Sequence, residues 1–212
     1  MQNGFVKYLS EALNGELPGI NAHCRLFPEG RELLPPINEA EKMKHSAILF
    51  LIFPENEKFY TCLIKRPASM RYHPGQLAFP GGKVEKGDLS PQMAAIRETE
   101  EEVGVGPGSY LIIGKLSDLY IPVSNFIIHP YLAWADRKPD FFANYSEVED
   151  IVLFPLHDFM ENEHIEQTQM TTSFGMTNVP YYSCYSEKVW GATAMILSEF
   201  FEITKRYQPV RE

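Results

Sequence analysis

The spacing of hydrophobic positions changes several times along this chain, and the changes predict both helices and strands. Near the start, Phe5, Leu9 and Leu13 recur at helical spacing, which predicts a short amphipathic helix over residues 5–13. Runs of apolar and β-branched residues bounded by turn residues predict strands further on. These strands are expected over 46–53, 58–66, 110–120 and 125–134, with another around 150–154. The PENE segment between the first two runs predicts a hairpin.

The remaining segments complete a mixed pattern. Residues 14–44 are rich in Pro and Gly and predict an extended wrap across the domain surface. A second hairpin is expected from 164–174 and 179–186, and the last apolar run predicts a helix from about 189 to 205. Because helices and strands are interspersed irregularly, the pattern favours an α+β fold over a doubly wound parallel sheet.

One further helix carries its own start and stop signals. Ser90 is a favoured N-cap residue, and Pro91 suits the first helical position because its missing N–H would have no partner there. Gly104 can adopt the left-handed conformation that ends a helix. The sequence therefore predicts a helix between these residues.

Composition narrows the class of protein. A length of 212 residues suits one domain, divided here into an N-terminal helix and wrap over 1–44 and a main domain over 45–206. The net charge of −9 disfavours binding to nucleic acid or an anionic membrane. The chain has no apolar run of the roughly 18 residues that a membrane span needs. Three scattered cysteines without a C-x-x-C pair predict neither a disulfide framework nor a zinc site, which fits the cytoplasm. None of this specifies the oligomeric state, and a homodimer remains open.

Candidate chemistry is concentrated in the stretch RETEEEVG, residues 97–104. At 100° per residue, Glu102 lies about 40° and Glu101 about −60° from Glu98, so these three carboxylates share one helix face. Glu100 points elsewhere and is expected to be solvated. Like charges at this spacing destabilise a helix by roughly 0.2–0.5 kcal/mol per pair, and no Lys or Arg follows within reach.

The rest of this helix supports a site on that face. Ala94 and Ala95 share it and are small enough to let a ligand approach, whereas Met93, Ile96 and Val103 fall opposite and are expected to be buried. A plain solvated acidic face is the alternative interpretation. A divalent cation explains the cluster better, because hard cations prefer carboxylate oxygens and turn the repulsion into attraction.

The surrounding residues form a recognisable motif. The run from Gly82 to Val105 resembles the Nudix family signature G-x5-E-x7-R-E-U-x-E-E-x-G-U, where U is a bulky aliphatic residue. The chain departs from that signature in three ways. Asp88 stands for the first Glu, the spacer to Arg97 is one residue longer, and Thr99 replaces an aliphatic residue.

A second motif lies upstream, between Arg66 and Gly82. It resembles the signature L-L-T-x-R-S-x3-R-x3-G-x3-F-P-G-G of the coenzyme A pyrophosphatase branch of the Nudix family. The LLT and Ser positions differ, being Cys62-Leu63-Ile64 and Pro67. The segment WGATA, residues 190–194, also resembles that branch, so the likeness covers roughly residues 45–205.

The resemblance implies a Nudix-like α/β/α sandwich around a mixed β-sheet. It implies divalent-metal-dependent hydrolysis of a nucleoside-diphosphate-linked substrate, namely coenzyme A or a derivative cleaved to 3′,5′-ADP and 4′-phosphopantetheine. Two alternatives remain: a Nudix pyrophosphatase for ADP-ribose or a dinucleotide, and a non-catalytic Nudix-fold binding module.

The resemblance also implies roles for particular residues. Glu98 acts as catalytic base or metal ligand, and Arg97 orients it. The implied ligands of Mg²⁺ or Mn²⁺ are Glu98, Glu101 and Glu102, joined by the Gly82 backbone and by Glu147. The implied contacts to a small-molecule nucleotide substrate are Arg66, Arg71, Phe79 and Gly81.

Overall fold

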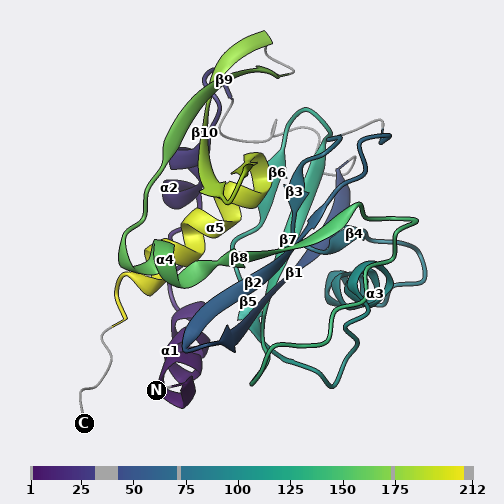
Figure 1. The fold of residues 1–212 in the computed structure, drawn as a ribbon, viewed down its shortest axis with the longest axis vertical. Coiled ribbons are helices and arrows are strands. Elements are labelled where there is room, and N and C mark those ends of the chain that lie inside the picture. Colours follow the sequence, from purple (N-terminus) through teal and green to yellow (C-terminus); the bar gives the residue numbers. More distant parts are fainter. Residues whose placement is uncertain (1, 32–42, 71–72, 173–174, 208–212) are drawn as a thin grey trace.

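The computed structural model describes residues 2–31, 43–70, 73–172 and 175–207. A mixed sheet lies at the centre, with one helix against one face and several helices and a smaller sheet against the other (Figure 1). The expected α/β/α sandwich is therefore confirmed. The central strands are β1 (Lys44–Glu55), β2 (Lys58–Lys65), β3 (Leu77–Ala78), β4 (Gly81–Lys83), β5 (Leu111–Lys115), β6 (Leu119–Ile121), β7 (Phe126–Trp134) and β8 (Asp150–Pro155). The covering helices are α3 (Pro91–Val103) on one face and α5 (Gly191–Thr204) on the other.

The strands β1 and β2 are paired at one end and diverge beyond Ile52 and Thr61, and this point of divergence is called the fork. The two strands form the predicted hairpin and pair from Ile52–Thr61 to Glu55–Lys58. Beyond that point they separate, and residues 77–83 fill the gap. There β3 pairs with the end of β2, Leu49 donates its N–H to the Pro80 carbonyl, and β4 pairs with the start of β1. On its other side β1 runs parallel to β7. The glycines at 81 and 82 thus lie where the sheet opens.

Each face of the sheet buries its own core. Alternate β1 residues Phe50 and Ile52 pack toward α5, while Leu49 and Leu51 pack toward α3. This alternation is the period of two expected for a strand covered on both faces. It explains why the 46–53 segment is almost continuously apolar.

The helix α3 forms where its local signals predict. The Ser90 hydroxyl accepts the Met93 N–H at 3.3 Å, and Gly104 has a left-handed φ of 71°. Thr99 is fully buried at the position where the family signature has an aliphatic residue, and its hydroxyl donates to the Ala95 carbonyl at 2.7 Å. The Thr substitution therefore leaves no unsatisfied donor in the core.

The N-terminal segment is more structured than the expected wrap. After α1 (Gln2–Leu13), the chain forms α2 (Ile20–His23) and the 3₁₀ turn η1 (Cys24–Leu26). The wrap prediction is therefore wrong for these residues, and its positions 32–42 lie outside the described part. Phe5, Leu9 and Leu26 are buried in the same core as α5. Apolar contact with the main domain, which the local Pro and Gly content does not reveal, orders this segment.

A buried carboxylate ties this segment to α5. Glu199 is completely buried and accepts hydrogen bonds from the Gly19 N–H (3.0 Å) and the Ser117 hydroxyl (2.6 Å), and its other oxygen lies 3.0 Å from His23 Nε2. The Ser117 N–H also donates to the Glu199 carboxylate. Burial opposes ionisation of Glu199, but the partners at His23, Ser117 and Gly19 outweigh it and lower the pKa of the carboxyl.

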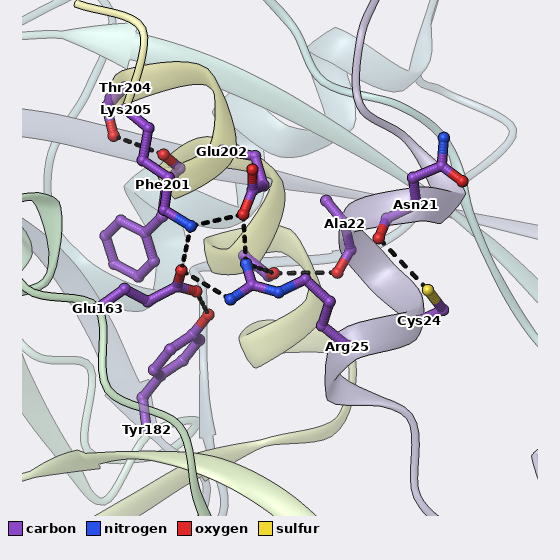
Figure 2. Close-up of polar contacts among 11 residues, drawn as sticks. Asn21, Ala22, Cys24, Arg25, Glu163, Tyr182, Phe201, Glu202, Thr204 and Lys205 are labelled. Carbon is purple, nitrogen blue, oxygen red and sulfur yellow. Dashed lines mark hydrogen bonds and ion pairs between the residues drawn. The ribbon is translucent and has the colours of Figure 1, made fainter.

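A second polar cluster joins η1 to α5 at the surface (Figure 2). Arg25 donates to Glu202 at 2.6 Å and to Glu163 at 2.8 Å. Lys205 contacts the same two carboxylates at 2.6 and 2.7 Å, and Glu163 also accepts the Tyr182 hydroxyl. The four charged groups therefore form a ring in which cations and carboxylates alternate, and its Glu163 side chain is only 4% exposed.

The C-terminal half contains the expected second hairpin and differs from the predicted elements in three other features. The predicted 110–120 strand is divided into β5 and β6, because residues 116–118 leave the ladder and Ser117 bonds to Glu199. The second hairpin is present as β9 (Glu166–Thr172) and β10 (Gly175–Cys184). The final helix starts later than predicted, at Gly191, because β11 (Glu187–Trp190) pairs with β10. A short helix α4 (Leu156–Glu161) was not predicted.

Among the helices that the structure describes, none has both the length and the apolar character needed to span a membrane.

Candidate active site

Two glycines bring the sheet and α3 into close contact. A side chain on Gly81 would overlap the Ala47 carbonyl of β1, and one on Gly82 would collide with the Glu98 carboxylate. The Gly81 N–H also donates to Glu102 Oε2 at 2.9 Å. Only glycine allows this approach, so the Gly-Gly pair is required for Glu98 and Glu102 to reach the fork.

Arg97 gathers three acidic side chains. Its Nη1 lies 2.8 Å from Glu98 Oε1 and 2.9 Å from Glu101 Oε2, while its Nε and Nη2 donate to the two oxygens of Asp88 at 3.2 and 3.1 Å. Its Nη2 also donates to the Lys83 carbonyl at 3.3 Å. The Arg97 guanidinium thus partly neutralises the charge of all three carboxylates. Hydrogen bonds from Arg97 and from the Glu85 N–H lower the pKa of Asp88, which stays ionised and holds Arg97 in place.

Burial makes ionisation of the two inner carboxylates costly. Desolvation, reinforced by Glu98 and Glu147, raises the pKa of Glu102 to about 8 despite the Gly81 N–H and the charge of Arg66. Desolvation also raises the pKa of Glu98, with smaller contributions from Glu101 and Glu147, although Arg97 opposes the rise. A further positive charge near these groups would therefore be strongly favoured.

The exposure of α3 corrects part of the helical-wheel prediction. Ala94 and Ala95 are completely buried, so the face that carries Glu98 and Glu102 packs onto the sheet and no ligand reaches the alanines. Met93, expected to be buried, is 44% exposed, and Ile96 is only partly buried. The sheet contacts the alanine face because the small side chains let the helix approach closely.

Glu147 reaches the site from a separate loop. The Asn144 N–H caps the end of α3 by donating to the Glu102 carbonyl at 3.0 Å. Asn144 Nδ2 then donates to Glu147 Oε1 at 3.2 Å, and Glu147 raises the pKa of both Glu98 and Glu102. The sequence indicated Glu147 only through the resemblance. Asn144, which holds it, carried no signal in the sequence.

The residues predicted to contact the substrate lie in different surroundings. Arg66 follows β2 directly and is close enough to lower the pKa of Glu102. Its Nε is buried and has no hydrogen-bond partner among the described residues. Phe79 is only 2% exposed and packs against Phe50 at 4.5 Å between ring centroids, so it supports the fork from the core. Arg71 lies outside the described residues.

The donor set is chemically suited to a hard divalent cation. Four carboxylates lie around the fork: Glu98, Glu101, Glu102 and Glu147. Because residue 82 is glycine, no side chain separates its backbone from the Glu98 carboxylate. In the described part of the chain, no three acidic, His or Cys side chains converge on one point as they stand. Arg97 and Gly81 instead hold the carboxylates, so an ion would have to displace part of these contacts.

Comparison with known proteins identifies this arrangement. A model of the NUDIX domain matches residues 43–174, which include the fork, α3 and the Glu147 loop. The chain belongs to the Nudix family. The predicted family is thereby confirmed, and enzymes of this family typically use a divalent metal ion.

Two curated relatives show similarity over most of the chain. A probable nudix hydrolase of Schizosaccharomyces pombe is 28% identical over 88% of this chain and 66% of its own length. A peroxisomal coenzyme A diphosphatase of Caenorhabditis elegans is 34% identical over 71% of this chain and 64% of its own length. The chain thus spans just under two thirds of these relatives.

The fold also matches solved structures. A Nudix hydrolase from M. smegmatis superposes with a TM-score of 0.55, covering 88% of this chain and 98% of the other at 14% identity. The matched part of this chain is longer than residues 43–174.

Proposed function

We propose that this Nudix protein hydrolyses the diphosphate of coenzyme A or a derivative, giving 3′,5′-ADP and 4′-phosphopantetheine. The observation that carries the proposal is the position of Arg66. Its side chain is partly buried, its Nε has no hydrogen-bond partner among the described residues, and its charge lowers the pKa of Glu102 on α3. A guanidinium suits the oxygens of a phosphate, and the Arg66–Gly82 segment resembles the coenzyme A branch. The name of the C. elegans relative agrees with this substrate.

The acidic residues divide the remaining tasks. Glu98 and Glu101, with Glu102, Glu147 and the Gly82 backbone, would hold Mg²⁺ or Mn²⁺. Such an ion neutralises phosphate charge and lowers the pKa of bound water. Glu98 is the candidate to accept a proton from the attacking water, since it lies at the fork and is oriented by Arg97. Asp88 keeps Arg97 in the position that this role requires.

The test is a product analysis with metal removed and restored. The purified protein is treated with EDTA and then given Mg²⁺ or Mn²⁺ with coenzyme A, an acyl-coenzyme A, ADP-ribose or NADH. We expect no hydrolysis without metal and, on its return, the highest kcat/KM for a coenzyme A compound, with 3′,5′-ADP as product. A higher kcat/KM for ADP-ribose or NADH would overturn the coenzyme A assignment. Binding without any turnover would favour the non-catalytic module.

The phosphate role of Arg66 makes a separate prediction. Arg66→Ala should raise KM for coenzyme A about 10- to 150-fold, because a charge-assisted contact contributes roughly 1.5–3 kcal/mol. Arg66→Lys should recover part of the loss, since a point charge cannot bind two oxygens at once. Steady-state kinetics on coenzyme A and 3′-dephospho-coenzyme A check both.

Comparing the two substrates also shows which phosphate group Arg66 contacts. An equal loss on both means that Arg66 contacts the diphosphate, and a loss on coenzyme A alone means that it contacts the 3′-phosphate. Lys58→Ala is the control, because Lys58 pairs with Asp158 on the surface. An Arg66→Ala enzyme with wild-type KM on both substrates would contradict the role.

A further inference from the structure

The segment that follows Arg66 is held by one carboxylate. Pro67 to Met70 form a turn closed by the Met70 N–H and the Pro67 carbonyl at 3.0 Å. Inside this turn, the Ala68 N–H donates to Glu149 Oε2 at 3.2 Å. Arg66 itself is fixed through its backbone, which pairs with Gln76 and Gly75 at 3.0 Å each. Among the described residues, the side-chain contact to this turn therefore comes from Glu149.

The Glu149 backbone is anchored to the same strand. Its N–H donates to the Lys65 carbonyl at 2.8 Å, next to the last β2–β8 pair, Lys65 with Asp150. Its Oε1 lies 3.5 Å from Lys65 Nζ, which also contacts Glu187 of β11 at 2.9 Å. Exposed ion pairs of this kind contribute little to global stability. The arrangement instead orients the Glu149 side chain toward Ala68.

The same short run of chain carries Glu147. Val148, between the two glutamates, is completely buried and therefore anchors the backbone that carries both of them. Glu147 is held by Asn144, and Asn144 is bonded to the end of α3. Residues 147–149 thus connect the turn after Arg66 to the helix that carries the acidic cluster.

We propose that Glu149 is a positioning residue that sets the distance between Arg66 and the carboxylates of the site. It does so by accepting the Ala68 N–H, and it has no contact with substrate. The inference rests on the proposed function only in taking Arg66 as a phosphate contact.

Three variants separate the hydrogen bond from the ion pair. Glu149→Ala removes both, Glu149→Gln keeps an oxygen acceptor for Ala68 but loses the charge, and Glu187→Gln removes the other carboxylate on Lys65 without touching the turn. We expect Glu149→Ala to raise KM about 3- to 10-fold, the effect of one lost hydrogen bond, with kcat changed less than twofold. Glu149→Gln should restore KM, and Glu187→Gln should match the wild type.

Hydrogen exchange provides a readout that needs no substrate. Exchange in the peptide containing Ala68 should be faster in Glu149→Ala than in the wild type and near normal in Glu149→Gln. If the wild type prefers ADP-ribose, the coenzyme A assignment fails, and KM is measured on ADP-ribose with the same expectation for Glu149.

Two results would overturn the positioning role. One is an unchanged KM in Glu149→Ala. The other is an equal rise in all three variants, which would assign the effect to the charge around Lys65.

Discussion

Replacing Glu98 with Gln is expected to reduce kcat by about 10²- to 10⁴-fold, the usual range for loss of a general base. Glu98 lies against Gly82, its pKa is raised mainly by burial, and Arg97 holds one of its oxygens at 2.8 Å. The amide keeps the size and the hydrogen bond from Arg97 but can neither accept a proton nor bind a cation well. Single-turnover kinetics at saturating metal measure the chemical step.

Glu100→Gln is the matched control for this experiment. Glu100 belongs to the same helix and the same run of acids, but it is exposed and has no contact with Arg97 in the described structure. Its replacement should leave kcat within about twofold. If Glu98→Gln keeps more than a tenth of the wild-type kcat, another group, with Glu147 the first candidate, must activate the water.

The largest loss of stability is expected from Glu199→Ala, about 3–5 kcal/mol, as found when one partner of a buried charged network is removed. The change leaves the Gly19 N–H, the Ser117 hydroxyl and the His23 ring without their shared acceptor inside the protein. Denaturant unfolding measures the difference. Glu161→Ala, at a surface acid that is 71% exposed, should change stability by less than about 0.5 kcal/mol.

The same carboxylate makes a prediction about pH. Because the folded pKa of Glu199 is lowered, its stabilisation is complete above the unfolded value of about 4.3 and is lost as the pH falls through the folded pKa. The free-energy difference between wild type and Glu199→Gln should therefore shrink below about pH 4. A difference that stays constant down to acid unfolding would mean that Glu199 is not ionised in the folded protein.

Local signals in the sequence were enough to predict several features. The ends of α3 follow from Ser90, Pro91 and Gly104, because a cap involves only neighbouring residues. The β1–β2 hairpin follows from two apolar runs separated by a short polar turn. The order of Gly82, Arg97, Glu98, Glu101 and Glu102 was sufficient to predict the family, which the comparison confirmed.

Only the tertiary structure decided how these parts meet. Whether Met93 or Ala95 is buried depends on which face of α3 the sheet contacts, and that contact comes from strands distant in the sequence. The burial of Phe79 follows from the fork between β1 and β2 in the same way.

The polar contacts between residues far apart in the chain could not be predicted from the sequence either. Glu199 is separated from His23 by 176 residues and Glu149 from Ala68 by 81. In a linear sequence such carboxylates look like any surface acid. The role of Glu199 arises only when folding removes water and leaves a few donors within reach, because a buried carboxylate must then find its partners inside the protein. Glu149 stays exposed, and its contact with Ala68 arises because the fold brings the two segments together.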